Sequence, residues 1–516
     1  MIKRMPMIVL TSLLAALSFK AAAAAPEVEL SGGSLQGSTV GTVQVFKGIP
    51  YAKPPVGDLR WRAPQPAAPW DGLRDATQFA ASCEQPRRKS GDVIPWTAEY
   101  LQDPPFSEDC LYLNVWTPST RSAAHLPVVV WIHGGGFVEG SGAVPVYDGA
   151  HLAGRGVVVV TINYRLGLFG FLATPELDAE HDGSGEFGMM DQVAALQWVK
   201  DNIDRFGGDP SKVTIEGQSA GAISVHHLLA APSAKGLFAR AIAESNAWSH
   251  TALVPLADAD AGGNALANLV GASDLAALRA VPADRLIALQ TDPRLAQTAH
   301  FWPADNGSFI PAGTPERTDV PVLLGSNHDE ASAFSPDWQI HTKAAFEQML
   351  EQRFHPYADR FAALYPASTD AEVSAAVRHL LADSASAGVI AWSQARGAQA
   401  APAWGYRFTH PEPGPLATRF ATFHSAEVPY VFGTLDVGDR PFTARDHAIS
   451  HVVQSYWVNF IRTGNPNGAG LMKWPSLDSQ HFMQLGDGQA VTPLLTDAQR
   501  EAFRQWLDAG GQISLF

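Results

Sequence analysis

The chain has 516 residues, of which 46% are hydrophobic and 17% charged, a composition that excludes a disordered protein and supplies enough apolar residues for a large core. The net charge of −15 disfavours nucleic acid as a partner, because an acidic surface repels the phosphate backbone. Two cysteines are too few for a disulfide scaffold or an all-cysteine zinc site.

The N-terminus has the pattern of an export signal. Lys3 and Arg4 precede a mostly apolar run over residues 7–19, and small residues over 21–25 would permit cleavage. A membrane anchor is the alternative, but spanning needs about 20 apolar residues and this run is shorter. We therefore predict a cleaved signal peptide over residues 1–25, a secreted or periplasmic protein, and no stable membrane insertion.

Short apolar runs rich in Val and Ile predict buried strands of a parallel sheet covered on both faces. Between the second and third runs, apolar residues recur at spacings of three or four from Val193 to Phe206, and Gly207 ends this helix signal. Strand, helix and strand in that order predict a βαβ unit. The four runs are residues 128–133, 157–163, 213–217 and 320–324.

Two segments rich in Ala and Leu, with scattered Pro, interrupt the strand pattern. They cover about residues 249–313 and 331–403, and we interpret both as helical insertions. The sequence has neither an internal repeat nor a long low-complexity linker. We therefore predict one large α/β domain over residues 26–516, with a mostly parallel central sheet, helices on both faces and helical insertions.

The sharpest local motif is Gly-Gln-Ser-Ala-Gly over residues 217–221. It follows a strand signal and precedes a helix signal over residues 222–230. A serine on such a crowded turn needs small neighbours, which Gly217 and Gly221 provide. The turn would lift the Ser219 hydroxyl out of the sheet and aim the Ala220 N–H at the same space. We predict that Ser219 is a nucleophile.

A second motif, His-Gly-Gly-Gly-Phe over residues 133–137, follows the first predicted strand. Consecutive glycines leave backbone N–H groups uncovered, so this loop can bind a developing oxyanion. A flexible turn is the alternative for three glycines taken alone. The serine turn later in the same chain favours the oxyanion loop.

A serine nucleophile needs a base and an orienting carboxylate, which in this arrangement follow it in the order acid, then histidine. Glu330 comes just after the run at 320–324, with Asp329 as its adjacent competitor and His328 as a third titratable group. His424 comes soon after a strand-like stretch and is the candidate base. Spacing alone does not choose between Glu330 and Asp329.

Two further pairs have structural interpretations. His226 and His227 follow the serine turn as packed or surface helix histidines, and no HExxH zinc motif is present, so we predict no metal site. Export to an oxidising compartment would let Cys83 and Cys110 pair, and two buried thiols are the alternative.

Together these motifs resemble the type-B carboxylesterase/lipase family, the cholinesterase-like branch of the α/β-hydrolases. The matching stretches run through most of the mature chain, so no single motif carries the resemblance. They are residues 46–52, 54–57, 60–61, 108–115, 133–137, 163–165, 191–192, 206–210, 217–221 and 464–467, with His424 and Glu427.

The resemblance implies an α/β-hydrolase fold, a disulfide between Cys83 and Cys110, and a reaction that needs no metal or organic cofactor. It also chooses Glu330 over Asp329 as the acid. The implied catalytic residues are Ser219 as nucleophile, Glu330 as acid and His424 as base. The implied oxyanion donors are the N–H groups of Gly135, Gly136 and Ala220.

The chain departs from the family at two places. Gln218 stands where the family usually has Glu, which removes a negative charge beside the base and predicts an acid limb of the pH–rate profile at lower pH. It also weakens the case for a cationic choline substrate, and we interpret Trp96 as a rim or surface tryptophan. Asn246 replaces a usual Gly and tolerates the same left-handed turn.

We therefore predict a secreted serine carboxylesterase acting on a small-molecule ester. An amidase or carbamate hydrolase, a lipase, and a non-catalytic cholinesterase-like binding protein are the alternatives. The sequence fixes neither the substrate nor the oligomeric state. Candidate residues of the substrate pocket are Phe137, Gln218, Trp248 and Trp302, whereas Trp70, Trp116 and Trp198 are interpreted as packing residues.

Overall fold

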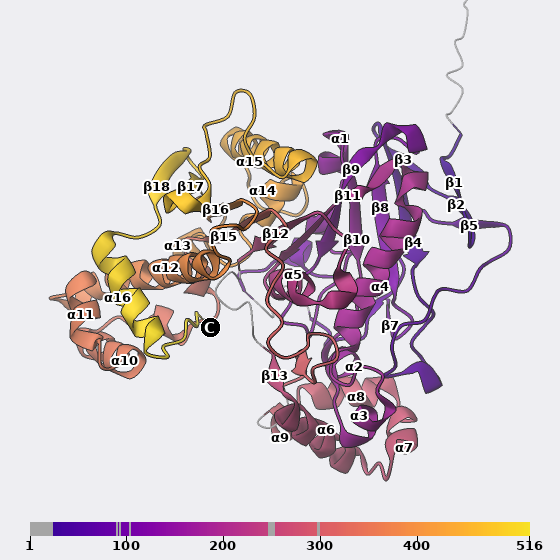
Figure 1. Ribbon diagram of the computed structural model, residues 1–516, viewed down its shortest axis with the longest axis horizontal. Helices are drawn as coiled ribbons and strands as arrows, with labels where there is room; N and C mark the ends of the chain where they lie inside the picture. Colours follow the sequence, from indigo (N-terminus) through magenta and orange to yellow (C-terminus); the bar gives the residue numbers. More distant parts are fainter. Residues whose placement is uncertain are drawn as a thin grey trace, which may run out of the picture.

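The structure, a computed structural model, describes residues 24–88, 91, 94–102, 105–245, 253–296 and 300–515. Nearly all of the predicted signal peptide therefore lies outside the described residues. Within them, an eleven-stranded sheet forms the centre of the molecule, with the strand order β18-β17-β16-β15-β12-β11-β9-β10-β8-β4-β3 (Figure 1). Its strands are β3 (Ser38–Val40), β4 (Val43–Pro50), β8 (Tyr112–Thr117), β9 (Leu126–Ile132), β10 (Val158–Ile162), β11 (Gly208–Gln218), β12 (Arg240–Glu244), β15 (Val322–Asn327), β16 (Ala403–Phe408), β17 (His481–Leu485) and β18 (Ala490–Pro493).

The middle of this sheet is parallel. Neighbouring strands run parallel from β10 across to β17, and antiparallel strands β8, β4 and β3 at one margin and β18 at the other complete it. The four predicted strands are present as β9, β10, β11 and β15, and the α/β prediction is confirmed. Strand β11 begins at Gly208, earlier than predicted, and its register with β9 shifts before Val213. Pro210, which has no N–H to donate, lies in that irregular stretch.

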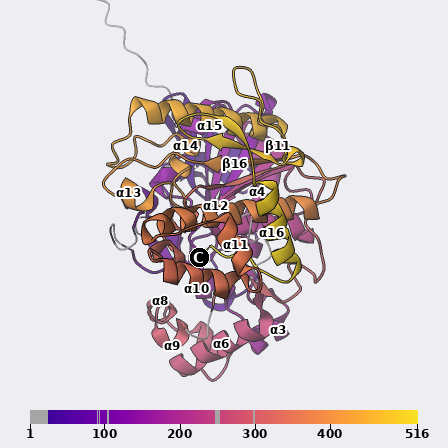
Figure 2. The ribbon, with the colours of Figure 1, turned by 90° about the vertical axis from the view of Figure 1, so that its left-hand side faces the viewer.

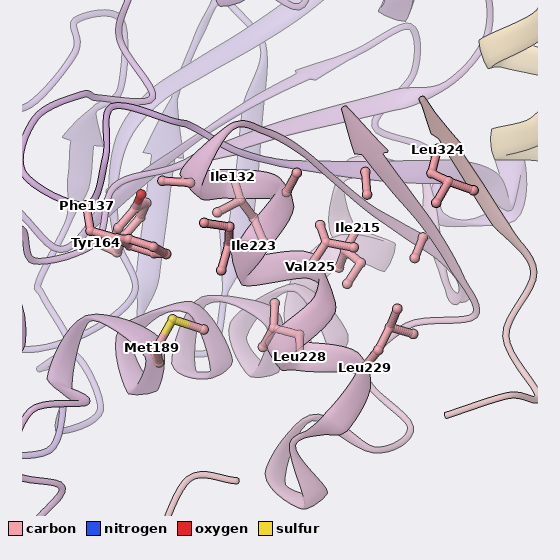
Figure 3. Close-up of a cluster of buried hydrophobic side chains, with 14 of the residues drawn as sticks. Ile132, Phe137, Tyr164, Met189, Ile215, Ile223, Val225, Leu228, Leu229 and Leu324 are labelled. Atoms are coloured by element: carbon pink, nitrogen blue, oxygen red, sulfur yellow. The ribbon is translucent and has the colours of Figure 1, made fainter. Parts of the chain in front are cut away.

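Alternate residues of the strands serve two separate cores. Along β9, Val130 and Ile132 belong to one hydrophobic cluster, whereas Val129 and Trp131 belong to another. The first cluster is covered by α4 (Phe187–Asn202) and α5 (Ala220–Ala230), as Figure 3 shows for the apolar side chains of α5. The second is covered by α14 (Val428–Phe432) and α15 (Ala444–Thr463). Burial on both faces explains why the strands are continuously apolar.

The predicted βαβ unit is formed by β10, α4 and β11. Helix α4 starts six residues before the predicted periodic stretch and continues into a 3₁₀ turn over Ile203–Phe206. Gly207 ends the turn in a left-handed conformation, with φ of 77°. Glycine adopts this conformation without a Cβ clash, so the chain can turn directly into β11.

Both segments with the insertion pattern contain helices, which form two groups, and α12 of the second group packs against β15 of the sheet (Figures 1 and 2). The first group lies at one end of the molecule together with α3 (Pro175–Glu180), and the second packs with α16 (Asp497–Asp508). In the described part of the chain, every helix is too short or too polar to cross a membrane. The first group is α6 (Leu256–Val270), α7 (Leu275–Arg279), α8 (Ala283–Gln290) and α9 (Pro293–Ala296), and the second is α10 (Lys343–Phe354), α11 (Ala358–Leu364) and α12 (Asp370–Ala395).

Small elements tie the loops to this frame. A disulfide joins Cys83 and Cys110, as the family resemblance implied, next to the short parallel pair β6 (Ser82–Cys83) and β7 (Phe106–Ser107). The remaining elements are β1 (Glu27–Leu30), β2 (Gly33–Gln36), β5 (Leu73–Asp75), β13 (Val254–Pro255), β14 (Ala304–Asp305), α1 (Ala150–Gly154), α2 (Gly167–Phe171) and α13 (Ala417–Phe420).

Candidate active site

Ser219 lies on a tight turn between β11 and α5. Its backbone has φ of 59° and ψ of −123°, a combination that costs energy for any residue with a side chain. The turn is crowded: a Cβ on Gly221 would lie 2.0 Å from the Ile132 oxygen, and a Cβ on Gly217 would lie 2.4 Å from the Gly221 oxygen. The motif therefore needs both glycines, and the serine side chain remains partly exposed at the end of the strand.

The triple-glycine loop packs directly against this turn. A Cβ on Gly134 would lie 2.7 Å from the Gln218 carbonyl oxygen and 3.0 Å from the Ser219 Cβ. Gly135 has φ of 103°, and its carbonyl accepts hydrogen bonds from the N–H groups of Val138 and Glu139. The loop thus places uncovered backbone beside the serine, at the N-terminus of α5. This is the arrangement that an oxyanion hole requires.

His424 and Glu330 form a buried hydrogen-bonded pair. His424 Nδ1 lies 2.5 Å from Glu330 Oε2, and both side chains are 3% exposed. The other carboxylate oxygen of Glu330 accepts the Asn327 N–H at 2.6 Å, which fixes the carboxylate at the end of β15. A carboxylate held in this way orients the imidazole and stabilises its protonated form.

The other imidazole nitrogen of His424 points toward the serine turn. The side-chain Nε2 of Gln218, the residue before Ser219, lies 3.2 Å from His424 Nε2. The described structure therefore brings the predicted acid and base together, and the base faces the residue adjacent to the predicted nucleophile. Because Gln218 is neutral, it adds no charge to this contact.

A small aromatic cluster of Phe334, Trp96 and Phe423 lies beside His424. The ring centroid of Phe334 lies 5.6 Å from that of His424, and Phe334 is 49% exposed. Trp96 packs against Phe334 at 4.9 Å and against Phe423 at 5.9 Å, and its Nε1 donates to the Ser425 hydroxyl at 3.4 Å. Sequence reasoning did not identify Phe334, although it lies four residues after Glu330, where the chain leaves the acid loop.

Asp329, the sequence competitor of Glu330, faces away from His424. It pairs with Arg378 of α12 through both carboxylate oxygens and with His328 Nδ1 at 2.8 Å. Burial raises the pKa of Asp329, but the hydrogen bonds from His328 and Arg378 more than offset this effect, so the pKa is lowered. Asp329 is therefore an ionised, paired carboxylate and not the partner of the histidine.

The predicted pocket aromatics have different outcomes. Phe137 is 0% exposed and its ring packs in the core against Phe171 and Trp302, with centroids 5.3 and 5.6 Å away, and its role in a substrate pocket stays a prediction. Trp302 is partly buried on the outer side of that cluster. Trp248 lies outside the described residues, as does Asn246.

Three buried glutamates lie behind the histidine. Glu427 accepts hydrogen bonds from Ser245 at 3.0 Å and from the Asn327 side chain at 2.5 Å. Glu244 accepts from Trp457 Nε1 at 2.7 Å, and the charge of Glu216 on the neighbouring strand acts on its carboxyl. Burial raises the pKa of all three carboxyls, so each of these glutamates is protonated more readily than a glutamate on the surface.

Other titratable residues have structural roles. His226 and His227 are buried in α5, so they are packed and not surface histidines. His226 Nδ1 lies 3.0 Å from Glu316. The described ranges contain no group of three or more His, Cys, Asp or Glu side chains that could hold a metal ion.

A mixed sheet with a serine on the strand–helix turn after β11, and with an acid and a histidine on later loops, defines an α/β-hydrolase. Comparison with known proteins refines this class. The profile of the Carboxylesterase family matches residues 24–503, and the chain belongs to that family of serine carboxylic ester hydrolases.

Relatives are similar over nearly the whole length. The para-nitrobenzyl esterase of Bacillus subtilis (strain 168) is 39% identical over 471 residues, which cover 86% of this chain and 91% of that protein. The fumonisin B1 esterase of Sphingopyxis macrogoltabida is 37% identical, with 89% and 87% covered. A solved PNB esterase has a TM-score of 0.77 at 35% identity, over 92% of this chain and 99% of that one.

Proposed function

We propose that the protein is a serine carboxylesterase that works through an acyl-enzyme on Ser219, with His424 as base and Glu330 as orienting acid. The observation that carries the proposal is the 2.5 Å hydrogen bond between His424 and Glu330, with Nε2 of the imidazole facing the serine turn. Asp329 does not compete for this role, because Arg378 and His328 occupy its carboxylate.

The reaction follows from these positions. His424 Nε2 takes the Ser219 proton as the serine oxygen attacks the ester carbonyl, and the N–H groups of Gly135, Gly136 and Ala220 stabilise the oxyanion. The carbon–oxygen bond to the alcohol then breaks, and His424 gives its proton to that alcohol. Water attacks the acyl-serine by the same route and releases the acid. Glu330 balances the imidazolium in both halves.

The aromatic rings of Phe334 and Trp96 beside His424 indicate which esters fit. His424 protonates the leaving alcohol, so the alcohol must lie beside it, where the partly exposed ring of Phe334 and the ring of Trp96 also lie. Burial of apolar area against such rings favours a bulky apolar alcohol. A benzyl-type alcohol meets this requirement, and the name of the para-nitrobenzyl esterase relative points to the same kind of ester.

Export is part of the proposal. The basic and apolar pattern of residues 1–25 has the order of a signal peptide, and the Cys83–Cys110 disulfide is a bond that persists in oxidising compartments. N-terminal sequencing of protein recovered from outside the cytoplasm tests this point. A start near Pro26 supports cleaved export, and an intact Met1 in cytoplasmic protein contradicts it.

The catalytic proposal is tested with p-nitrophenyl esters from acetate to palmitate and with a benzyl and methyl ester pair. We expect hydrolysis that is lost in Ser219→Ala and retained in Ser211→Ala, which changes an exposed serine of β11, the strand before the serine turn. A fluorophosphonate should add its mass to the peptide with Ser219. Activity that survives Ser219→Ala would contradict the assignment of the catalytic triad. A jump in rate only above the solubility limit of the substrate would indicate a lipase. Turnover of matched anilides alone would indicate an amidase.

A further inference from the structure

We propose that Asp329 is a positioning residue of the catalytic site. Its carboxylate holds the loop that carries Glu330 against the loop that carries His424, and Arg378 on helix α12 holds that carboxylate in place. The inference rests on the proposed function, since it explains how the acid and the base of that triad keep their relative positions.

Two reciprocal hydrogen bonds join the loops beside the triad. The Asp329 N–H donates to the Thr422 carbonyl at 3.1 Å, and the Thr422 N–H donates to Asp329 Oδ2 at 3.1 Å. Asp329 comes one residue before Glu330, and Thr422 comes two residues before His424. The two bonds therefore fix the spacing of the loops close to Glu330 and His424, whose side chains must stay in contact.

The carboxylate that makes this connection is itself fixed. Its side chain is 0% exposed, and Arg378 binds it in a bidentate manner, with Nη2 2.7 Å from Oδ2 and Nε on Oδ1. His328 Nδ1 adds a bond to Oδ1 at 2.8 Å. A bidentate arginine imposes direction as well as attraction, so the carboxylate cannot rotate away from Thr422 without losing Arg378.

A second connection exists, but it does not reach the outer helices. The Asn327 side chain donates to the Phe423 carbonyl at 2.9 Å, and this joins the same two loops from inside the core. Asp329 alone of these two residues is bonded to α12, which belongs to the second helical group. The arginine is 43% exposed, so the clamp links a surface of the insertion to the triad.

The charged residues around Asp329 and His424 determine the direction in which the pH–rate profile should shift. His328 and Arg378 face Asp329 directly, and the buried Arg407 acts on it at longer range. Glu330 and Glu427 act on His424. A weaker clamp moves Glu330 away from the imidazole and disfavours the imidazolium, which shifts the acid limb of the pH–rate profile to lower pH.

The experiment compares Asp329→Asn and Arg378→Gln with the wild type on p-nitrophenyl acetate. Misplaced catalytic groups cost up to about 100-fold, so we expect kcat to fall about 10- to 100-fold in Asp329→Asn and about 3- to 10-fold in Arg378→Gln, with KM nearly unchanged. Both should shift the acid limb to lower pH. For Arg378→Gln this direction is decisive, because loss of a positive charge through space alone would move the limb to higher pH.

Asp337→Asn is the matched control. It breaks another arginine–carboxylate pair of the same insertion, Asp337 with Arg353 at 2.8 Å, and the Asp337 carboxylate holds neither loop, so kcat and the acid limb should stay as in the wild type. An unchanged kcat in Asp329→Asn, or an acid limb at higher pH in Arg378→Gln, would overturn the clamp. If Asp329→Asn does not fold, Arg378→Gln decides. If the Asp329 and Arg378 variants behave like the wild type but activity still depends on Ser219, only the clamp is contradicted and the proposed function stands. If Ser219→Ala remains active, the proposed function itself is contradicted.

Discussion

Gln218 reaches the proposed base from the residue before the nucleophile. Its amide Nε2 lies 3.2 Å from His424 Nε2, so a carboxylate at the same position would sit beside the imidazolium that forms during the reaction. We expect Gln218→Glu to move the acid limb of kcat/KM to higher pH by about one unit, because an opposite charge at this range favours the protonated imidazole. The measurement is the pH dependence of kcat/KM on a p-nitrophenyl ester.

Gln218→Leu separates charge from hydrogen bonding in that experiment. It removes the amide but adds no charge, so its acid limb should not follow that of Gln218→Glu. The electrostatic argument is contradicted if the glutamate variant keeps the wild-type limb, or if the leucine variant shifts upward by the same amount.

At the scale of elements, the sequence predicted those parts of the site that depend on local structure. The serine turn was readable because Gly217 and Gly221 have to be small between a strand and a helix. The choice between Glu330 and Asp329 was not readable from spacing, since it depends on which carboxylate His424 and Arg378 bind across the fold. Such contacts join segments that are about 50 to 100 residues apart, and periodicity does not report them.

The same limit applies to Phe137. An aromatic after a glycine loop has no sequence signal that separates a pocket wall from a core side chain. Here the ring packs against Phe171 and Trp302 and is fully buried. The residue that does lie exposed beside His424 is Phe334, on the loop after β15, and only the fold brings it there.

Strand β11 carries an unusual buried carboxyl, Glu216, next to Glu244 of β12. Burial raises the pKa of Glu216, and for Glu244 burial and then the charge of Glu216 raise the pKa, so the folded protein prefers protonated carboxyls at this place. A raised folded-state pKa gives stability that is fully present below the unfolded pKa. That stability is lost as the pH rises through the folded value.

Glu216→Gln should therefore stabilise the protein at pH 8 and have little effect near pH 4.5. The gain should be about 1–3 kcal/mol in the free energy of unfolding, since a shift of one pKa unit corresponds to about 1.4 kcal/mol. Urea unfolding at the two pH values measures it. Glu347→Gln, which changes an exposed glutamate on α10, is the control. It should change the free energy of unfolding little at either pH. A gain of the same size at pH 4.5 and pH 8 would contradict a titration effect.

In the whole molecule, the site is assembled from the carboxyl ends of parallel strands. Ser219 follows β11, Glu330 follows β15, and the His424 loop comes between β16 and α14, so all three reach one edge of the sheet. Parallel strands present their carboxyl ends together, which explains how residues over 200 positions apart meet. The disulfide-closed loop reaches the same edge, because Tyr100 donates to the Ser425 carbonyl at 3.3 Å.

Closure of that loop should matter to stability and to activity alike. Cys83 and Cys110 are 27 positions apart, and removing such a cross-link in Cys83→Ala/Cys110→Ala should lower the free energy of unfolding by about 3–4 kcal/mol in the chain-entropy model. Trp96 and Tyr100 lie within the loop and bond to Ser425, so a looser loop should also lower kcat/KM under conditions where the variant is folded. Urea unfolding and initial rates measure the two effects. Reduced wild type should match the variant, and the variant should not respond to reductant. If the variant loses stability but keeps the wild-type kcat/KM, the contacts of Trp96 and Tyr100 with Ser425 do not need the closed loop.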